Sequence, residues 1–206
     1  MASGEFAGPI HRLAGSEIPA ASAVFARAFQ CDPLFCCFLP RAAGRQRRLE
    51  RLFRSILQYG LHYGELQATS HELEGVAMWL PPGNSYGTIP RMARAGLLLL
   101  PLTIGPRCFF RVWRYSERIA GLRRRHILAP HWFLQLLGVD PQRQNQGHAT
   151  RLLRLMLERL DREKAPCCLD TAKRANLSFY ERFGFRVAAE GRGTSDLAYW
   201  LMVRDG

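Results

Sequence analysis

The most informative part of the chain is residues 136–153, which read Leu136-Leu137-Gly138-Val139-Asp140-Pro141-Gln142-Arg143-Gln144-Asn145-Gln146-Gly147-His148-Ala149-Thr150-Arg151-Leu152-Leu153. An apolar run of strand length ends at Val139. A tight loop of glutamine, asparagine and glycine follows, and a helix with a leucine-rich face begins near Gly147. The spacing predicts a strand, a turn and a helix in direct succession.

This turn is suited to a pyrophosphate. The first backbone N–H groups of a helix have no intrahelical acceptor and lie at the positive end of the helix dipole. Gly147 lets a ligand approach the backbone, Asn145 tolerates left-handed geometry, and Arg143 adds a charged donor. The loop is neither a Walker A loop nor a GxGxxG turn, so the pattern gives no support to ATP or NAD.

Apolar periodicity on either side of this unit predicts the remaining elements. Helices are expected over 18–29, 45–61, 107–125, 146–160 and 176–183, the first with Ser16 as its N-cap. Asp32-Pro33 should end the first helical pattern, and Leu155 should lie on the inward face of the helix over 146–160. An extended segment is expected over 9–13, and strands over 66–70, 75–80, 131–139, 167–171, 185–189 and 197–203. Strands and helices alternate in the C-terminal half, which favours an α/β or α+β sheet fold.

Length and composition indicate one globular domain over 1–206, with a helical insertion at about 88–129. Hydrophobic residues make up 48% and charged residues 22%, which excludes disorder and coiled coil for the whole chain. The net charge is +12, and all but two of the 29 basic residues are arginines. They are spread along the chain, so we expect a generally basic surface and no specific nucleic-acid partner.

The cysteines and the apolar segments bear on the compartment. Six cysteines include two vicinal pairs and no CxxC, which is a poor disulfide framework and a poor zinc site. Free thiols favour a reducing compartment. No signal peptide is visible at 1–8, and the most apolar stretch, 96–104, is about half of what spans a bilayer. We therefore expect a cytoplasmic protein without a metal or a membrane span.

At this point the sequence resembles a family. Gln144-x-x-Gly147-x-Ala149 matches the Q/R-x-x-G-x-G/A motif of GNAT-type N-acetyltransferases, although Asn145 stands where glycine is common. The later strings Leu169-Asp170-Thr171 and Asn176-Leu177-Ser178-Phe179-Tyr180-Glu181-Arg182-Phe183-Gly184-Phe185 resemble that family's closing segment. The resemblance covers about 10–203, and its nearest branch contains puromycin N-acetyltransferase. It implies an α+β fold: a mixed, largely antiparallel twisted sheet of about six to seven strands, flanked by helices and splayed at the cofactor site.

The resemblance also implies an activity, the direct transfer of acetyl from acetyl-CoA to a primary amine of a small molecule in a ternary complex, with CoA as product. The backbones of Leu137 and Val139 would meet the pantetheine arm, and the Asn176 side chain would hydrogen-bond to the same arm. Tyr180 would be the general acid facing the thioester sulfur. The pyrophosphate would be held by Gln142, Arg143, Gln144, Asn145, Gln146, Gly147, His148, Ala149 and Thr150.

The acceptor would lie opposite the CoA arm, beneath the helical insertion as a lid. Four residues would line its pocket, namely Asp32, Phe35, Trp79 and Tyr86. So basic a chain supplies few acids there, which favours a small, aromatic or weakly charged amine over a polyamine. The general base stays open between His126, His131, Glu117, Glu72 and water.

Other questions also stay open. A non-catalytic acyl-CoA-binding sensor or regulatory module is the main alternative to an enzyme. The lid's apolar runs at 97–100 and 108–110 either pack on the domain, as helical stripes commonly do, or touch lipid. Neither the acyl chain length nor the choice between monomer and homodimer follows from the sequence.

Overall fold

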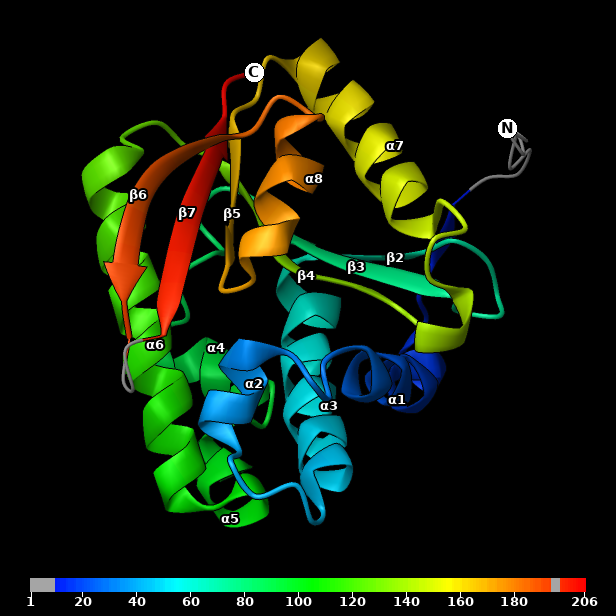
Figure 1. The fold of residues 1–206 in the computed structure, drawn as a ribbon, viewed down its shortest axis with the longest axis vertical. Helices are drawn as coiled ribbons and strands as arrows, with labels where there is room; N and C mark the ends of the chain where they lie inside the picture. The colour runs from blue at the N-terminus through cyan, green and yellow to red at the C-terminus, as the bar shows by residue number, and fades with distance from the viewer. Residues whose placement is uncertain (1–9, 194–196) are drawn as a thin grey trace.

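The structure is a computed structural model that describes residues 10–193 and 197–206, so Pro9 and the segment before it lie outside the described residues. A mixed sheet of seven strands, in the order β1-β2-β3-β4-β5-β7-β6, forms its centre (Figure 1). The strands are β1 (His11–Arg12), β2 (Glu65–Ala68), β3 (Gly75–Leu80), β4 (Trp132–Val139), β5 (Cys167–Thr171), β6 (Arg186–Arg192) and β7 (Ala198–Arg204). Neighbouring strands are antiparallel except β4 and β5, which confirms the predicted fold class.

Helices cover both faces of the sheet. They are α1 (Ile18–Ala28), α2 (Pro33–Phe38), α3 (Arg45–Tyr63), α4 (Ile89–Arg94), α5 (Leu100–Ile104), α6 (Pro106–His126), α7 (His148–Glu163) and α8 (Leu177–Glu181). Helices α7 and α8 lie on one side, and α1 to α6 lie on the other (Figure 1). Successive β3 side chains enter different cores: Trp79 packs with the α7 leucines, and Met78 packs with the α1 and α3 side chains. The apolar run of β3 is continuous because both of its faces are buried.

Between β3 and β4 the chain forms α4, the 3₁₀ turn η2 (Leu97–Leu99), α5 and α6, where the helical insertion is expected. The long helix α6 runs along the side of the molecule and packs against α2, β6 and β7 as well as α5. No helix among the described residues is both long enough and apolar enough to cross a membrane.

Two local expectations are wrong, and one is incomplete. Ser16 lies inside the 3₁₀ turn η1 (Gly15–Glu17), and the Glu17 carboxylate instead accepts from the Ala14 N–H at 2.7 Å. The first helix does end before Asp32-Pro33, as expected, but the pair also starts the short helix α2, in which the Asp32 carboxylate accepts from the Leu34 N–H at 2.9 Å. Leu155, expected inside, is 42% exposed because it faces away from the apolar stripe of α7.

Candidate functional site

The site begins where two parallel strands separate. Strands β4 and β5 pair only from Trp132↔Cys167 to Leu134↔Leu169. Strand β4 then continues to Val139 beside β3 alone, so the edge of β4 that faces β5 carries no strand there. The backbones of Leu137 and Val139 belong to this open segment, as the expected splay requires.

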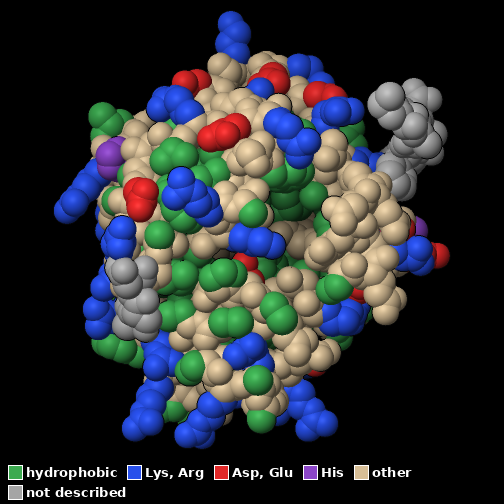
Figure 2. Space-filling model, viewed as in Figure 1, with side chains coloured by type: hydrophobic (Ala, Val, Ile, Leu, Met, Phe, Trp, Pro, Cys, Tyr) green, Lys and Arg blue, Asp and Glu red, His purple; other side chains and the backbone are tan. Residues whose placement is uncertain are grey.

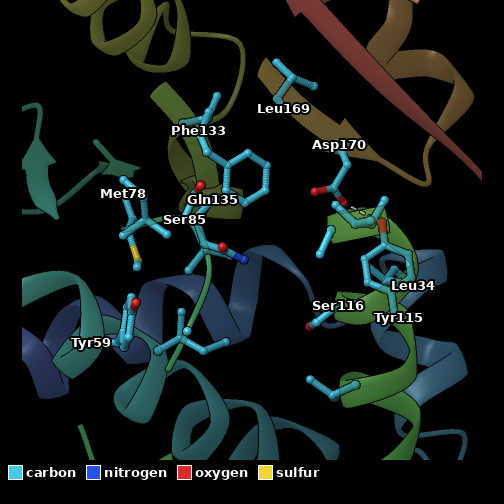
Figure 3. Close-up of a pocket in the computed structure, with 18 of the residues that line it drawn as sticks. Leu34, Tyr59, Met78, Ser85, Tyr115, Ser116, Phe133, Gln135, Leu169 and Asp170 are labelled. Carbon is cyan, nitrogen blue, oxygen red and sulfur yellow. Dashed lines mark hydrogen bonds between the residues drawn. The ribbon is translucent and has the colours of Figure 1, made fainter. Parts of the chain in front are cut away.

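A β-bulge reshapes β4 at the point of separation. Leu136 pairs with Met78 and Leu134 with Trp79, so Gln135 is the extra residue. Gln135 lines the cavity beneath the sheet (Figure 3). Three residues further on, a Cβ at Gly138 would lie 2.8 Å from the Phe25 ring, so the close approach of α1 to β4 requires glycine there.

The loop after β4 has the geometry of an anion-binding turn. It passes through the 3₁₀ turn η3 (Pro141–Arg143), and Asn145 and Gly147 have φ values of +62° and +87°. Asn145 therefore occupies the left-handed conformation that its side chain tolerates. Gly147 precedes α7, in which the Arg151 N–H to Gly147 carbonyl bond is 2.9 Å long. The backbone N–H groups of the first turn of α7, before Arg151, thus have no acceptor within the helix.

Asp140 fixes the start of this loop. Its carboxylate is paired with the Arg27 guanidinium of α1 and accepts from the Gln142 N–H at 3.1 Å. Partial burial acts to raise the pKa of Asp140, but Arg27 and the Gln142 N–H outweigh it and hold the pKa below its ordinary value. The Gln144 amide donates to the Val139 carbonyl at 3.3 Å. Residues 141–147 are exposed, so the turn is open to a ligand.

A cavity of about 420 Å³ lies beside the open edge of β4. Its walls come from the segment after α1, from α2, α3 and β3, from the 85–100 segment, and from α6, β4, β5 and α8. Most of the wall is apolar, with Phe29, Leu34, Phe35, Phe38, Leu52, Ile56, Met78, Leu80, Leu97, Leu100, Phe109 and Val112 among its residues. Polar groups line the cavity on two sides, with Asp170, Tyr115 and Ser116 on β5 and α6 and with Tyr59, Ser85 and Gln135 across from them (Figure 3).

Asp170 and Tyr115 form the shortest polar contact in this cavity. The Tyr115 hydroxyl on α6 donates to Asp170 Oδ2 on β5 at 2.5 Å (Figure 3). Burial raises the pKa of Asp170, although the Tyr115 hydrogen bond and the charge of Arg123 offset part of that rise. Burial and the Asp170 carboxylate raise the pKa of Tyr115 well above its ordinary value, so Tyr115 stays protonated and donates.

Tyr180 and Asn176 lie at the same end of the cavity. Tyr180 on α8 is buried, and within the described part of the chain its hydroxyl has no hydrogen-bond partner. Burial raises the pKa of Tyr180, with contributions from Asp170 and Asp32, so its hydroxyl stays protonated. Asn176 donates to Thr171 Oγ1 at 3.2 Å, which holds its amide at the end of β5.

Three of the four expected acceptor residues line the cavity, namely Asp32, Phe35 and Tyr86. Burial raises the pKa of Asp32 above its ordinary value. The expectation for Trp79 is wrong: its side chain is fully buried on the α7 side of the sheet and takes no part in the cavity wall. Alternation along β3 explains this, since Met78 and Leu80 face the cavity instead.

The candidate bases are widely separated. Glu117 lines the cavity, whereas Glu72 lies in the turn before β3 and His126 at the end of α6, both exposed. His131 is buried, its Nδ1 lies 2.9 Å from the Ala129 carbonyl oxygen, and burial lowers its pKa. Asp170 was missed as a candidate, although it lies inside the Leu-Asp-Thr string that carries the resemblance.

Arg123 is a second residue that the sequence did not single out. It lines the cavity but is only 3% exposed, and it donates to the Ser85 carbonyl at 2.9 Å. Its guanidinium lies 4.0 Å from the Phe133 ring centroid and 4.6 Å from that of Tyr86. Arg123 therefore fixes the 85–86 segment against β4.

Outside the cavity, His11, Glu17 and His71 bring three potential ligand atoms within 4.8 Å of one another. The His11 ring lies 2.8 Å from both Glu17 carboxylate oxygens, and His71 is exposed. The contact between the His11 ring and the Glu17 carboxylate accounts for this cluster. The free cysteines include Cys31 at the surface and the buried Cys167 and Cys168 of β5.

Comparison with known proteins gives a domain match and a fold match. Residues 106–187 match the family described as acetyltransferase (GNAT) domain. Among solved structures, the chain is similar to a histone acetyltransferase HPA2 and related acetyltransferase from Corynebacterium glutamicum, with a TM-score of 0.68 and 20% identity over 95% of this chain and 94% of that one.

Two further solved structures have the same fold. The ribosomal-protein-S18-alanine N-acetyltransferase from Escherichia coli aligns with a TM-score of 0.53 and 16% identity, over 96% of this chain and 92% of that one. Arylalkylamine N-acetyltransferase 2 from Aedes aegypti aligns with a TM-score of 0.57 and 13% identity, over 96% and 98%. None of these matches supports the puromycin N-acetyltransferase branch. The chain has the GNAT fold, and its residues 106–187 carry the acetyltransferase (GNAT) domain match.

Proposed function

We propose that this protein transfers an acetyl group from acetyl-CoA directly to a primary amine of a small molecule, within a ternary complex. One observation carries the proposal. The unpaired edge of β4 leads from a loop with two left-handed residues to a cavity that contains both a carboxylate and a protonated tyrosine. An extended cofactor with a phosphate end and a reactive end fits that arrangement.

The residues present fit acetyl-CoA. The pyrophosphate would meet the backbone of residues 142–150 and the positive end of α7, with Arg143 beside it. The pantetheine arm would hydrogen-bond to the backbone of Leu137 and Val139 along the edge of β4 that carries no strand. Asn176 faces the same space from the end of β5 and is the side-chain donor that we assign to the arm.

We assign Asp170 as the group that accepts the proton of the acceptor ammonium, directly or through a water. It lines the cavity, and its raised pKa makes it a better base than an ordinary aspartate. The neutral amine then attacks the thioester carbonyl, forming the C–N bond and a tetrahedral oxyanion. The nitrogen of this intermediate carries one proton more than the amide product. Collapse of the oxyanion breaks the C–S bond and leaves CoA as a thiolate, and the extra proton of the nitrogen passes to water or to that thiolate.

We assign Tyr180 to the leaving sulfur. Its hydroxyl stays protonated and has no partner among the described residues, so it can donate to the sulfur as negative charge develops. Because its pKa lies above that of an ordinary thiol, a hydrogen bond to the thiolate is favoured over complete proton transfer. Tyr180 is therefore the proposed catalytic hydrogen-bond donor to the leaving sulfur.

The cavity also supports an acceptor class. Its apolar wall fits an aromatic or aliphatic body, and the Asp32 and Asp170 carboxylates, which both line the cavity, suit a cationic amine. The cavity has no row of acids that a polyamine would need, since Glu117 is the one further carboxylate among its lining residues. A small amine with one cationic end therefore remains the proposed acceptor, and the arylalkylamine named for the Aedes aegypti neighbour has this character.

The remaining assignments are part of the same proposal. Residues 1–206 would act as one domain with 88–129 as lid, as a monomer or homodimer in the cytoplasm. The alternative, a sensor that binds acyl-CoA without turnover, would keep the β4 edge and the loop but would not need Asp170 or Tyr180.

Calorimetry with acetyl-CoA, with desulfo-CoA and ATP as controls, followed by thiol release with a panel of amines, tests the proposal. Micromolar binding with amine-dependent thiol release is the expected result. Binding without release for any amine would favour the sensor. The absence of acetyl-CoA binding would contradict the assignment of the loop.

A further inference from the structure

Apolar side chains are unusually exposed at one end of the molecule. The 3₁₀ turn η2 and helix α5 expose Leu98 by 46%, Leu99 by 60% and Leu102 by 84%. On the neighbouring helix α6, Phe110 is 49% exposed. In the same segment, Leu97 and Leu100 point inward and line the cavity. Packing of the insertion on the domain therefore explains those two leucines but not the exposed ones.

Arginines surround these apolar residues. Arg107 and Arg114 lie on the same stripe of α6 as Phe110, and the Arg114 guanidinium is 5.6 Å from the Phe110 ring centroid. Arg51 of α3 donates to the Thr103 carbonyl at 3.3 Å, which places α3 alongside α5, and Arg47 lies one turn earlier on the same face. We name this surface the arginine–leucine end; it comprises Leu98, Leu99, Leu102, Phe110, Arg47, Arg51, Arg107 and Arg114.

Acidic residues are scarce in the sequence that builds this end. No aspartate or glutamate occurs between Glu74 and Glu117, and Glu50 is the sole acid between Asp32 and Glu65. Basic side chains project from the lower end of the molecule in Figure 2, where α5 and the start of α3 lie in Figure 1. The surface is thus both apolar and predominantly positive.

We propose that the arginine–leucine end docks the protein on bilayers that contain anionic lipids. Leucines that enter the headgroup–acyl boundary while arginines meet lipid phosphates satisfy both properties of the surface at once. A nucleic acid would satisfy the arginines but leave the leucines in water. A second copy bound through the same surface would bring arginines together with no acids to pair them.

Vesicle sedimentation of the full-length protein tests the proposal at about 0.15 M salt. Vesicles of phosphatidylcholine alone are compared with vesicles that also contain phosphatidylserine. Wild-type protein is expected to sediment with the anionic vesicles and only weakly with the neutral ones. The proposal is overturned if the fraction of wild-type protein in the pellet is the same with anionic vesicles as with no vesicles.

Paired variants separate the two contributions. Leu99→Gln with Leu102→Gln should weaken binding about tenfold, because both side chains are exposed in solution and buried in the bilayer. Arg107→Gln with Arg114→Gln should weaken it by tenfold or more. Two matched controls change exposed residues of α7, on the opposite side of the sheet. One is the single variant Leu155→Gln, and the other is the double variant Arg154→Gln with Arg162→Gln. Each control should change vesicle binding less than twofold.

Two outcomes contradict membrane insertion. If the leucine pair leaves binding unchanged while the arginine pair abolishes it, the end is a general polyanion surface. If the protein self-associates without lipid and the leucine pair abolishes that association, a second copy is the occupant. Unchanged thermal unfolding of each variant shows that a loss of binding is not a loss of folding. Neither result depends on acetyl transfer.

Discussion

The Tyr115 hydroxyl of α6 and the Asp170 carboxylate of β5 lie 2.5 Å apart and join the insertion to the sheet at the cavity wall. The insertion is therefore tied to the residue that we assign as base, in addition to covering the site. Any change at Tyr115 acts on the reaction through Asp170, which makes Tyr115 a positioning residue.

Asp170→Asn should lower kcat by about a hundredfold or more, since a positioned base contributes roughly 10²- to 10⁴-fold. Acetyl-CoA affinity should change little, because the loop and the β4 edge are untouched. Steady-state thiol release and calorimetry measure the two effects. Glu117→Gln, at the other carboxylate considered as a base, is the matched control and should retain most of its activity. A reversed pattern would assign the base to Glu117.

Tyr115→Phe should move the acidic limb of the pH–rate profile to higher pH. The hydrogen bond from Tyr115 lowers the pKa of Asp170, so its removal lets that pKa rise further. Asp170 is then protonated, and inactive as a base, over more of the acidic range. The pH dependence of kcat/KM measures the shift. Tyr59→Phe changes a cavity tyrosine that donates to the Asn84 carbonyl, and its profile should match the wild type.

Tyr180→Phe should lower kcat by about a hundredfold while acetyl-CoA still binds, because the donor to the leaving sulfur is lost. The substitution removes a hydroxyl without a partner among the described residues, so the thermal stability should be kept. Tyr63→Phe on α3, outside the cavity wall, is the control. Unchanged turnover in Tyr180→Phe would remove the assigned role.

Two substitutions of Asn145 test whether acetyl-CoA binding depends on the left-handed backbone conformation of the loop. Asn145 has φ of +62°, and a left-handed residue costs about 1–2 kcal/mol unless it is glycine. Asn145→Gly should therefore preserve or modestly strengthen acetyl-CoA binding, whereas Asn145→Val should weaken it about tenfold. Calorimetry of the two variants decides the point, and equal affinities would show that the loop does not need this conformation to bind the cofactor.

The elements of the sheet could be predicted because their patterns are local. Strand β3 has the predicted bounds, Gly75–Leu80, and α1 and α3 begin at or next to the expected residues. The loop was predictable for the same reason, since Asn145 and Gly147 are the residue types that accept positive φ. Helix α2 was missed because six residues give no helical period, even with Asp32 as its cap.

The site itself could be predicted only in part. Trp79 was misplaced because a strand that is apolar on both faces does not reveal which side chains face the cavity. The β-bulge that sets Gln135 apart depends on its register against β3, and the contact of Tyr115 with Asp170 joins residues 55 positions apart. Such long-range contacts come from tertiary packing and leave no periodic signal in the sequence.

The short pairing of β4 with β5 has a mechanical consequence. With only three paired positions, the sheet consists of two blades joined over a short hinge, one formed by β1 to β4 and the other by β5 to β7. Amide hydrogens on the open edge of β4 should exchange rapidly with solvent, although they lie at the centre of a sheet. A pantetheine arm bound along that edge would slow this exchange and stiffen both blades together. The first substrate would then complete the sheet on which the second one reacts.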